Sequence, residues 1–120
     1  MPGIESRLSQ VFVNVIANAV SFSPPHGEIR IGARLDGRAV LVSVEDEGPG
    51  IPEDKLTAIF DRFYSERPAG EKFGTHSGLG LSISKQIIEA HRGRIWAENR
   101  LDADGTVIGA RFLIRLPAAP

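Results

Sequence analysis

A carboxylate and two glycines stand where a run of alternating apolar residues stops, in the segment Glu45-Asp46-Glu47-Gly48-Pro49-Gly50-Ile51. Asp46 offers a hydrogen-bond acceptor, and Gly48 and Gly50 leave the adjoining backbone free of side chains, so that a flat ligand can approach closely. The pattern predicts a binding site at the end of a strand. A polar turn is the competing interpretation, because Gly-Pro-Gly sequences are typical of turns.

A second group of polar residues lies between Glu5 and Phe22, where the sequence predicts an amphipathic helix that Pro24-Pro25 ends. Its apolar stripe consists of Leu8, Val11, Phe12, Val15, Ile16 and Ala19. A polar line recurs at the same three- and four-residue steps, formed by Arg7, Gln10, Asn14, Asn18 and Ser21. Amide oxygens can ligate a hard cation or accept hydrogen bonds. A solvated helix face is the alternative, although such faces usually favour Glu and Lys.

A third candidate is the glycine-rich segment from Gly74 to Ile83, which leads into a helix with Leu79, Ile83, Ile87 and Ala90 on one face. Free amide groups and the positive end of the helix dipole make such an entry a natural phosphate site, although glycines also serve simple helix entry. The preceding residues, Ser65 to Ser77, show no periodicity. A loop of this length is often a functional lid, and a disordered connection is the alternative.

The remaining elements supply a sheet. Ile29 to Leu35 and Val40 to Val44 alternate around Asp36-Gly37 and predict a hairpin. A short helix is expected from Pro52 to Phe60, and His91-Arg92-Gly93 should end the later helix with Gly93 as its left-handed cap. Arg94 to Glu98 and Val107 to Leu116 complete the strands. We therefore expect a two-layer α/β sandwich, a mixed sheet with helices packed on one face.

Composition limits the classes of function. The 120 residues suit a single domain, and 14 basic residues nearly balance 15 acidic ones, which gives no field that would favour nucleic acid. The absence of cysteine excludes disulfides and is compatible with a reducing cytoplasm. The three histidines are scattered without metal-ligand spacing, and neither a membrane span nor a signal peptide is visible. Met1-Pro2-Gly3 is typical of a cut chain, so we expect a larger parent protein.

The three candidates together suit a purine ring, a divalent cation and a polyphosphate, which is the case for a nucleotide site. Five motifs follow in order: Asn14-Val15-Ile16-Ala17-Asn18-Ala19, Asp46 to Ile51, Phe60-Asp61-Arg62-Phe63-Tyr64, Gly78 to Ile83 and Gly109-Ala110-Arg111-Phe112. From Arg7 to Pro117 the chain resembles the catalytic and ATP-binding domain of bacterial sensor histidine kinases, whose Bergerat fold is shared with the gyrase and Hsp90 ATPases.

The resemblance implies a role for each motif. Asp46 would accept a hydrogen bond from the exocyclic amine of adenine, Gly50 and Ile51 would line the base pocket, and Asn18 would ligate Mg²⁺ while Asn14 supports the phosphates. Residues 64–77 would form a mobile ATP lid, pinned by Phe60 and Phe63. The full set of implied ATP-binding residues is Asn14, Asn18, Ser21, Phe22, Asp46, Gly48, Gly50, Ile51, Phe63, Tyr64, Thr75, His76, Ser77, Gly78, Leu79, Gly80 and Leu81.

Departures from the family pattern bear on the reaction. Many members have a Lys and an Arg near the γ-phosphate where this chain has Ser21 and Ser65, and Phe22 replaces a Tyr. Charge partners for the phosphate could then come from Arg62, Arg67 or Lys72. Hydrolytic relatives usually carry a Glu where this chain has Asn14, which cannot accept a proton, so hydrolysis is disfavoured.

Three functions follow from the resemblance. The first is transfer of the ATP γ-phosphate to a histidine on a separate dimerisation domain, because none of His26, His76 and His91 lies in the family's phosphoacceptor setting. The second is a nucleotide-binding regulatory module without transfer, and the third is a hydrolytic ATPase. The first implies a monomeric domain from a homodimeric parent kinase, with its catalytic part in the cytoplasm, an inner-membrane anchor and a response regulator as partner.

Overall fold

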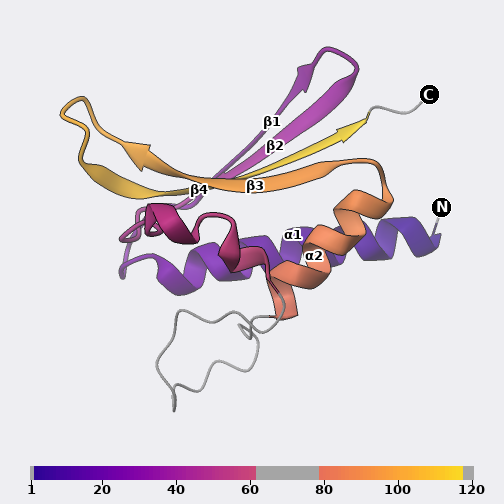
Figure 1. The fold of residues 1–120 in the computed structure, drawn as a ribbon, viewed down its shortest axis with the longest axis horizontal. Coiled ribbons are helices and arrows are strands. Elements are labelled where there is room, and N and C mark those ends of the chain that lie inside the picture. The colour runs from indigo at the N-terminus through magenta and orange to yellow at the C-terminus, as the bar shows by residue number, and fades with distance from the viewer. Residues whose placement is uncertain (1, 62–78, 118–120) are drawn as a thin grey trace.

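The computed structural model describes residues 2–61 and 79–117, which form two layers (Figure 1). In chain order the elements are α1 (Pro2–Phe22), β1 (Arg30–Asp36), β2 (Ala39–Glu45), two 3-10 turns (Glu53–Lys55 and Ala58–Phe60), α2 (Leu79–Ala90), β3 (Arg94–Leu101) and β4 (Val107–Pro117). Both helices lie on one face of the sheet, as Figure 1 shows. The predicted two-layer α/β sandwich is confirmed.

The direction of the strands differs from the prediction. The sheet has the order β1-β2-β4-β3, and all three pairings are antiparallel in the part of the chain that the structure describes. A mixed sheet was therefore the wrong expectation for these strands. The hairpin between β1 and β2 is confirmed, and Gly37 takes the positive φ of 65° that its tight turn requires.

The core lies between the helices and the inner face of the sheet. Val11, Val15 and Ala19 of α1 are fully buried, as the apolar stripe predicts. They pack in one cluster with residues of the sheet and of α2, including Phe112, Ile114 and Ile88. Phe60 meets Phe112 edge to face, with ring centroids 6.2 Å apart. The second 3-10 turn is thereby fixed to the core immediately before the predicted lid.

Two helical predictions need correction. Residues 52–60 form two 3-10 turns, closed by hydrogen bonds between residues i and i+3, such as Lys55 N–H to the carbonyl of Pro52. The burial of Ile59 and Phe60 in the second turn, rather than a helical repeat, decides the conformation of this segment. In α2 the predicted apolar face is only partly confirmed, since Ile87 is half-buried and packs against the core but other members of that face do not. The buried positions are Ser82, Ser84 and Ile88, whereas Ile83 and Ala90 are exposed.

The end of α2 also differs from expectation. Arg92, not Gly93, adopts the left-handed conformation, with φ of 62°. Gly93 donates its N–H to the carbonyl of Ile88, and a Cβ at Gly93 would lie 2.5 Å from the carbonyl oxygen of Arg115. Close approach to β4 therefore explains this glycine, and the strained cap falls one residue earlier.

Candidate functional site

Asp46 lies directly after β2 and is only 2% exposed. Its Oδ1 accepts hydrogen bonds from the N–H groups of Gly48 (2.8 Å) and Ala110 (3.0 Å), and its own N–H donates to the carbonyl of Ala110 (3.0 Å). Among the described residues, none donates to Oδ2. One oxygen thus holds the loop in place while the other is left as an acceptor, which is what recognition of a ligand amine would require.

The glycines around Asp46 allow close backbone contact. Gly48 is buried, and Gly50 has a φ of 82°, a conformation that side chains rarely adopt. Gly109 on β4 faces the carbonyl of Asp46 so closely that a Cβ there would overlap the carbonyl oxygen. The same carbonyl accepts a hydrogen bond from Nη1 of Arg100 at 2.6 Å. The first residues of β4 therefore lie directly against the loop and hold Asp46 in place.

An ion-pair network lies beside these residues of β4. Glu45 Oε2 accepts from Arg111 Nε at 2.6 Å, Arg111 Nη1 donates to Glu98 at 2.9 Å, and Arg100 Nε lies 3.8 Å from Glu45. The hydrogen bonds to Glu45 and then Glu98 raise the pKa of Arg111 above its ordinary value. The network ties β2, β3 and β4 together where the sheet meets the Asp46 loop.

The polar line of α1 divides into two parts. Arg7 and Gln10 are exposed, which agrees with a solvated face, whereas Asn14, Asn18 and Ser21 are half-buried. Asn14 Nδ2 donates to Ser84 Oγ of α2 at 3.5 Å. The Oγ atom of Ser21 is buried and has no hydrogen-bond partner among the described residues. An unpaired hydroxyl on this stretch of helix suits a site that a polar ligand completes.

The loop after α1 brings this helix end to the Asp46 loop. Glu47 N–H donates to Ser23 Oγ at 3.4 Å, and Glu28 N–H donates to Glu47 Oε1 at 2.8 Å. The structure therefore places two of the three predicted groups next to each other: the end of the α1 polar line and the carboxylate with its glycines.

The third group is only partly placed. The predicted helix after the glycine-rich segment is α2, which is described from Leu79 on, with Gly80 in its first turn and Leu81 half-buried. Phe22 is the last residue of α1. Several predicted residues lie outside the described ranges: Arg62, Phe63, Tyr64, Arg67, Lys72, Thr75, His76, Ser77 and Gly78. Phosphate binding at this helix entry, the lid and the γ-phosphate charge partners stay predictions.

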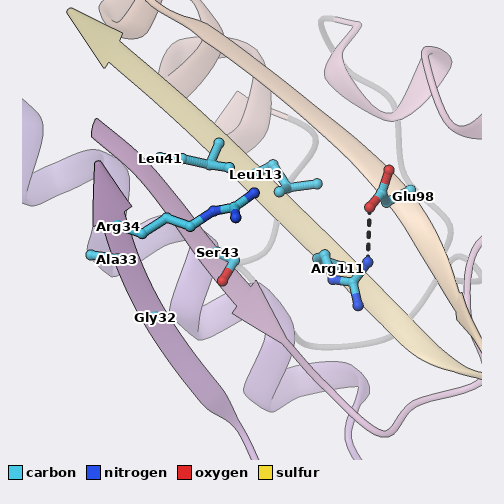
Figure 2. Close-up of a pocket in the computed structure, with 8 residues that line it drawn as sticks. All are labelled: Gly32, Ala33, Arg34, Leu41, Ser43, Glu98, Arg111 and Leu113. Carbon is cyan, nitrogen blue, oxygen red and sulfur yellow. Dashed lines mark hydrogen bonds and ion pairs between the residues drawn. The ribbon is translucent and has the colours of Figure 1, made fainter. Parts of the chain in front are cut away.

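A cavity elsewhere on the molecule is distinct from this site. It has a volume of about 430 Å³ and lies on the sheet face opposite the helices, lined by Arg34, Leu41, Ser43 and Leu113 among others (Figure 2). Figure 2 also shows the ion pair of Arg111 and Glu98 at its rim. The cavity contains none of the predicted nucleotide-binding residues. Within residues 2–61 and 79–117, three or more metal-ligating side chains do not gather anywhere, and neither helix is long and apolar enough to span a membrane.

Several residues that the structure brings to the site have no predicted role in the sequence. Ser84, Asn99 and Arg100 contact Asn14 or the Asp46 loop from elements 48 to 70 residues away in sequence. Ala110, which binds Asp46, lies within the predicted motif from Gly109 to Phe112. Ser84 carried one available signal, since a serine amid the apolar residues of α2 needs a polar partner. Asn99 and Arg100 bind backbone groups of the Asp46 loop, and nothing in their local sequence indicates this role.

A buried acceptor at a strand end, glycines that admit close approach and a half-buried amide line on the facing helix define a nucleotide-binding α/β sandwich. A family model described as histidine kinase-, DNA gyrase B- and HSP90-like ATPase matches residues 3–120. The chain therefore belongs to this family, as an ATP-binding catalytic domain of the sensor histidine kinase type.

Individual relatives agree with this assignment. The sensor protein ChvG of Rhizobium meliloti (strain 1021) is 50% identical over 119 residues, which cover 98% of this chain and 21% of ChvG. Histidine kinase ThkA, solved in complex with the response regulator TrrA, has a TM-score of 0.75 at 34% identity, covering 96% of this chain and 29% of that one.

Full-length ShkA in complex with AMPPNP has a TM-score of 0.76 at 31% identity, covering 96% of this chain and 22% of ShkA. The chain thus spans about a fifth of the length of the curated relative and of ShkA.

Proposed function

We propose that this domain binds Mg-ATP and donates the γ-phosphate to a histidine on the separate dimerisation domain of a two-component sensor kinase. The main support for nucleotide binding is that the two carboxylate oxygens of Asp46 have different hydrogen-bond partners. Its Oδ1 is used by two backbone N–H groups, and Oδ2 accepts from no described residue. A buried acceptor beside glycines fits the exocyclic amine of adenine. The related ShkA was solved with AMPPNP, an ATP analogue, which supports the same ligand class.

The residues present also fit a magnesium ion. Mg²⁺ prefers oxygen ligands, and Asn18 offers an amide oxygen on the half-buried part of α1, where it forms no hydrogen bond with another described residue. The ion would neutralise phosphate charge when bound. Asn14 and the Ser21 hydroxyl lie on the same line of α1, so both are suited to polar contacts with the phosphates.

Transfer is favoured over hydrolysis by the chemistry at position 14. An amide cannot remove a proton from water, and Asn14 instead donates a hydrogen bond to Ser84. Phosphoryl transfer requires mainly positioning and charge neutralisation, with the nucleophile supplied by the partner domain. The basic residues that could neutralise the γ-phosphate are Arg62, Arg67 and Lys72. A response regulator would then receive the phosphoryl group through the parent kinase, a partner class supported by the ThkA–TrrA complex.

The site leads to a two-part experiment. Titration calorimetry with ATP should give saturable binding that is tighter with MgCl₂ than with EDTA. Asn18→Ala should remove most of this magnesium dependence while leaving binding in EDTA unchanged. If ATP gives no saturable heat in either buffer, the nucleotide proposal is wrong.

The second part tests transfer. Labelled ATP and this domain should phosphorylate the supplied dimerisation domain of the parent kinase, and a His→Gln acceptor variant of that domain should remain unlabelled. Steady phosphate release by this domain alone would favour the hydrolytic ATPase. ATP binding without labelling would favour the regulatory module, for which Ser21 and Ser65 are the supporting residues.

A further inference from the structure

The loop that follows Asp46 is held by side chains. Among the described residues, the backbone groups from Glu47 to Ile51 form no hydrogen bonds with other backbone groups. Glu47 N–H is bound by Ser23 Oγ, and Gly48 N–H by the carboxylate of Asp46. The far end of the loop depends on a different element of the fold, strand β3.

Asn99 of β3 binds both backbone groups of Ile51. Its Oδ1 accepts from Ile51 N–H at 2.7 Å, and its Nδ2 donates to the Ile51 carbonyl at 2.6 Å. An asparagine amide carries one acceptor and two donors in a plane, so it can pair with a peptide as a neighbouring strand would. These two bonds join residues that are 48 positions apart in sequence.

The adjoining glycine shows how closely the loop lies against this support. A Cβ at Gly50 would fall 2.8 Å from Asn99 Oδ1 and would also overlap Val107 of β4. Gly50 has a φ of 82°, a conformation that side chains rarely adopt, so both the space and the backbone conformation favour a glycine beside Ile51. The amide of Asn99 therefore fixes the position of the loop relative to the sheet as well as the conformation of Ile51.

We propose that Asn99 is a positioning residue for nucleotide binding, which acts through Ile51 and sets the distance between Ile51 and Asp46. This inference rests on the proposed ATP site. Asp46 and Ile51 stand at the two ends of one short loop. The first is held to β4 by Ala110, and the second is held to β3 by Asn99. Without the bonds from Asn99, the loop keeps the acceptor of Asp46, but Ile51 is no longer held in a fixed position relative to it.

The test compares Asn99→Ala with a matched control on the same hairpin. The side chain of Asp102 also forms two hydrogen bonds with the backbone: its Oδ1 accepts from the N–H groups of Asp104 (2.8 Å) and Thr106 (3.0 Å), in the turn that connects β3 and β4. Asp102→Ala should therefore cost a comparable number of bonds without touching the loop. Asn99→Asp is the nearly isosteric second variant, which keeps an acceptor for Ile51 N–H and loses the donor.

Each variant is measured for thermal unfolding and for its Kd with ATP and with GTP. Asn99→Ala is expected to weaken ATP binding about tenfold and to reduce the preference for ATP over GTP, with Asn99→Asp changing in the same direction. Asp102→Ala should lower Tm while keeping the Kd for ATP within about twofold of the wild type.

Equal Kd values for wild type and both Asn99 variants would overturn the positioning role. An equal loss of affinity in Asp102→Ala and Asn99→Ala would also overturn it, because the effect would then follow stability alone. A wild-type domain that binds neither nucleotide would instead overturn the proposed function. The two failures are thus distinguishable.

Discussion

Replacement of Asp46 by asparagine separates the two tasks of this side chain. Asn keeps one carbonyl oxygen, which can accept from Gly48 and Ala110 as Asp46 Oδ1 does at 2.8 and 3.0 Å. The amide nitrogen then occupies the place of Oδ2 and presents a donor where the carboxylate presented an acceptor. Folding should therefore be nearly preserved while the ligand-facing chemistry is inverted.

The size of the effect follows from the type of hydrogen bond that is lost. A hydrogen bond to a charged group contributes about 1.5–3 kcal/mol, which corresponds to a roughly 10- to 150-fold weaker Kd for ATP. Asp46→Ala differs because it leaves two buried N–H groups without an acceptor, at about 1–3 kcal/mol each. For a domain of this size that lowers Tm by roughly 10 °C or more, whereas Asp46→Asn should stay within a few degrees.

Calorimetric titration of each variant with ATP and GTP, together with thermal unfolding, measures both quantities. The 6-position of guanine carries an oxygen acceptor, so the Asp46→Asn amide should narrow the preference for ATP over GTP. Wild-type affinity for ATP in Asp46→Asn would refute the assignment of Oδ2 to the base. An unchanged Tm in Asp46→Ala would refute the structural role of Oδ1.

Two further substitutions test backbone conformation by thermal unfolding, one beside Asp46 and one at the end of α2. Gly109→Ala would push a Cβ into the carbonyl oxygen of Asp46 and should destabilise the domain by more than about 2 kcal/mol. Gly105→Ala is the control, because Gly105 has a φ of 82° but no atom lies within 4 Å of the added Cβ. Similar losses of Tm in both variants would show that overlap with the Asp46 carbonyl is not the cause. Arg92→Gly should raise Tm by a few degrees, because a left-handed residue with φ of 62° is relieved of about 1 kcal/mol of strain; a lower Tm would contradict it.

Much of the fold could be predicted because its signals are local. The stripe with Val11 and Val15 specified α1, and Asp36-Gly37 between two alternating runs specified the hairpin. The strand directions could not be read in the same way, since β2 pairs with β4 across some 70 residues. No local sequence pattern indicates that β2 pairs with β4. A mixed sheet and an antiparallel sheet were therefore equally compatible with the sequence.

The errors have specific physical causes. The face of α2 was only partly predicted because apolar periodicity ignores buried serines, and Ser84 is fully buried against the polar line of α1. The left-handed cap was placed at Gly93 by propensity, but tertiary contact with Arg115 requires a glycine there for another reason. Asp46 was found because a carboxylate before two glycines is visible locally, whereas Asn99 acts on a backbone group and has no such signature.

The attachment of the Asp46 loop to β3 and β4 has a consequence for biosynthesis. Because Asp46 is bound to Ala110, 64 residues later, the base-binding loop lacks its support until nearly the whole domain has left the ribosome. Closing so long a chain segment is an entropic cost that must be met before the contact forms. A nascent chain that already contains α1 and the first hairpin should therefore not retain ATP. Nucleotide capture would then mark completion of the final hairpin and protect only finished domains from unfolding.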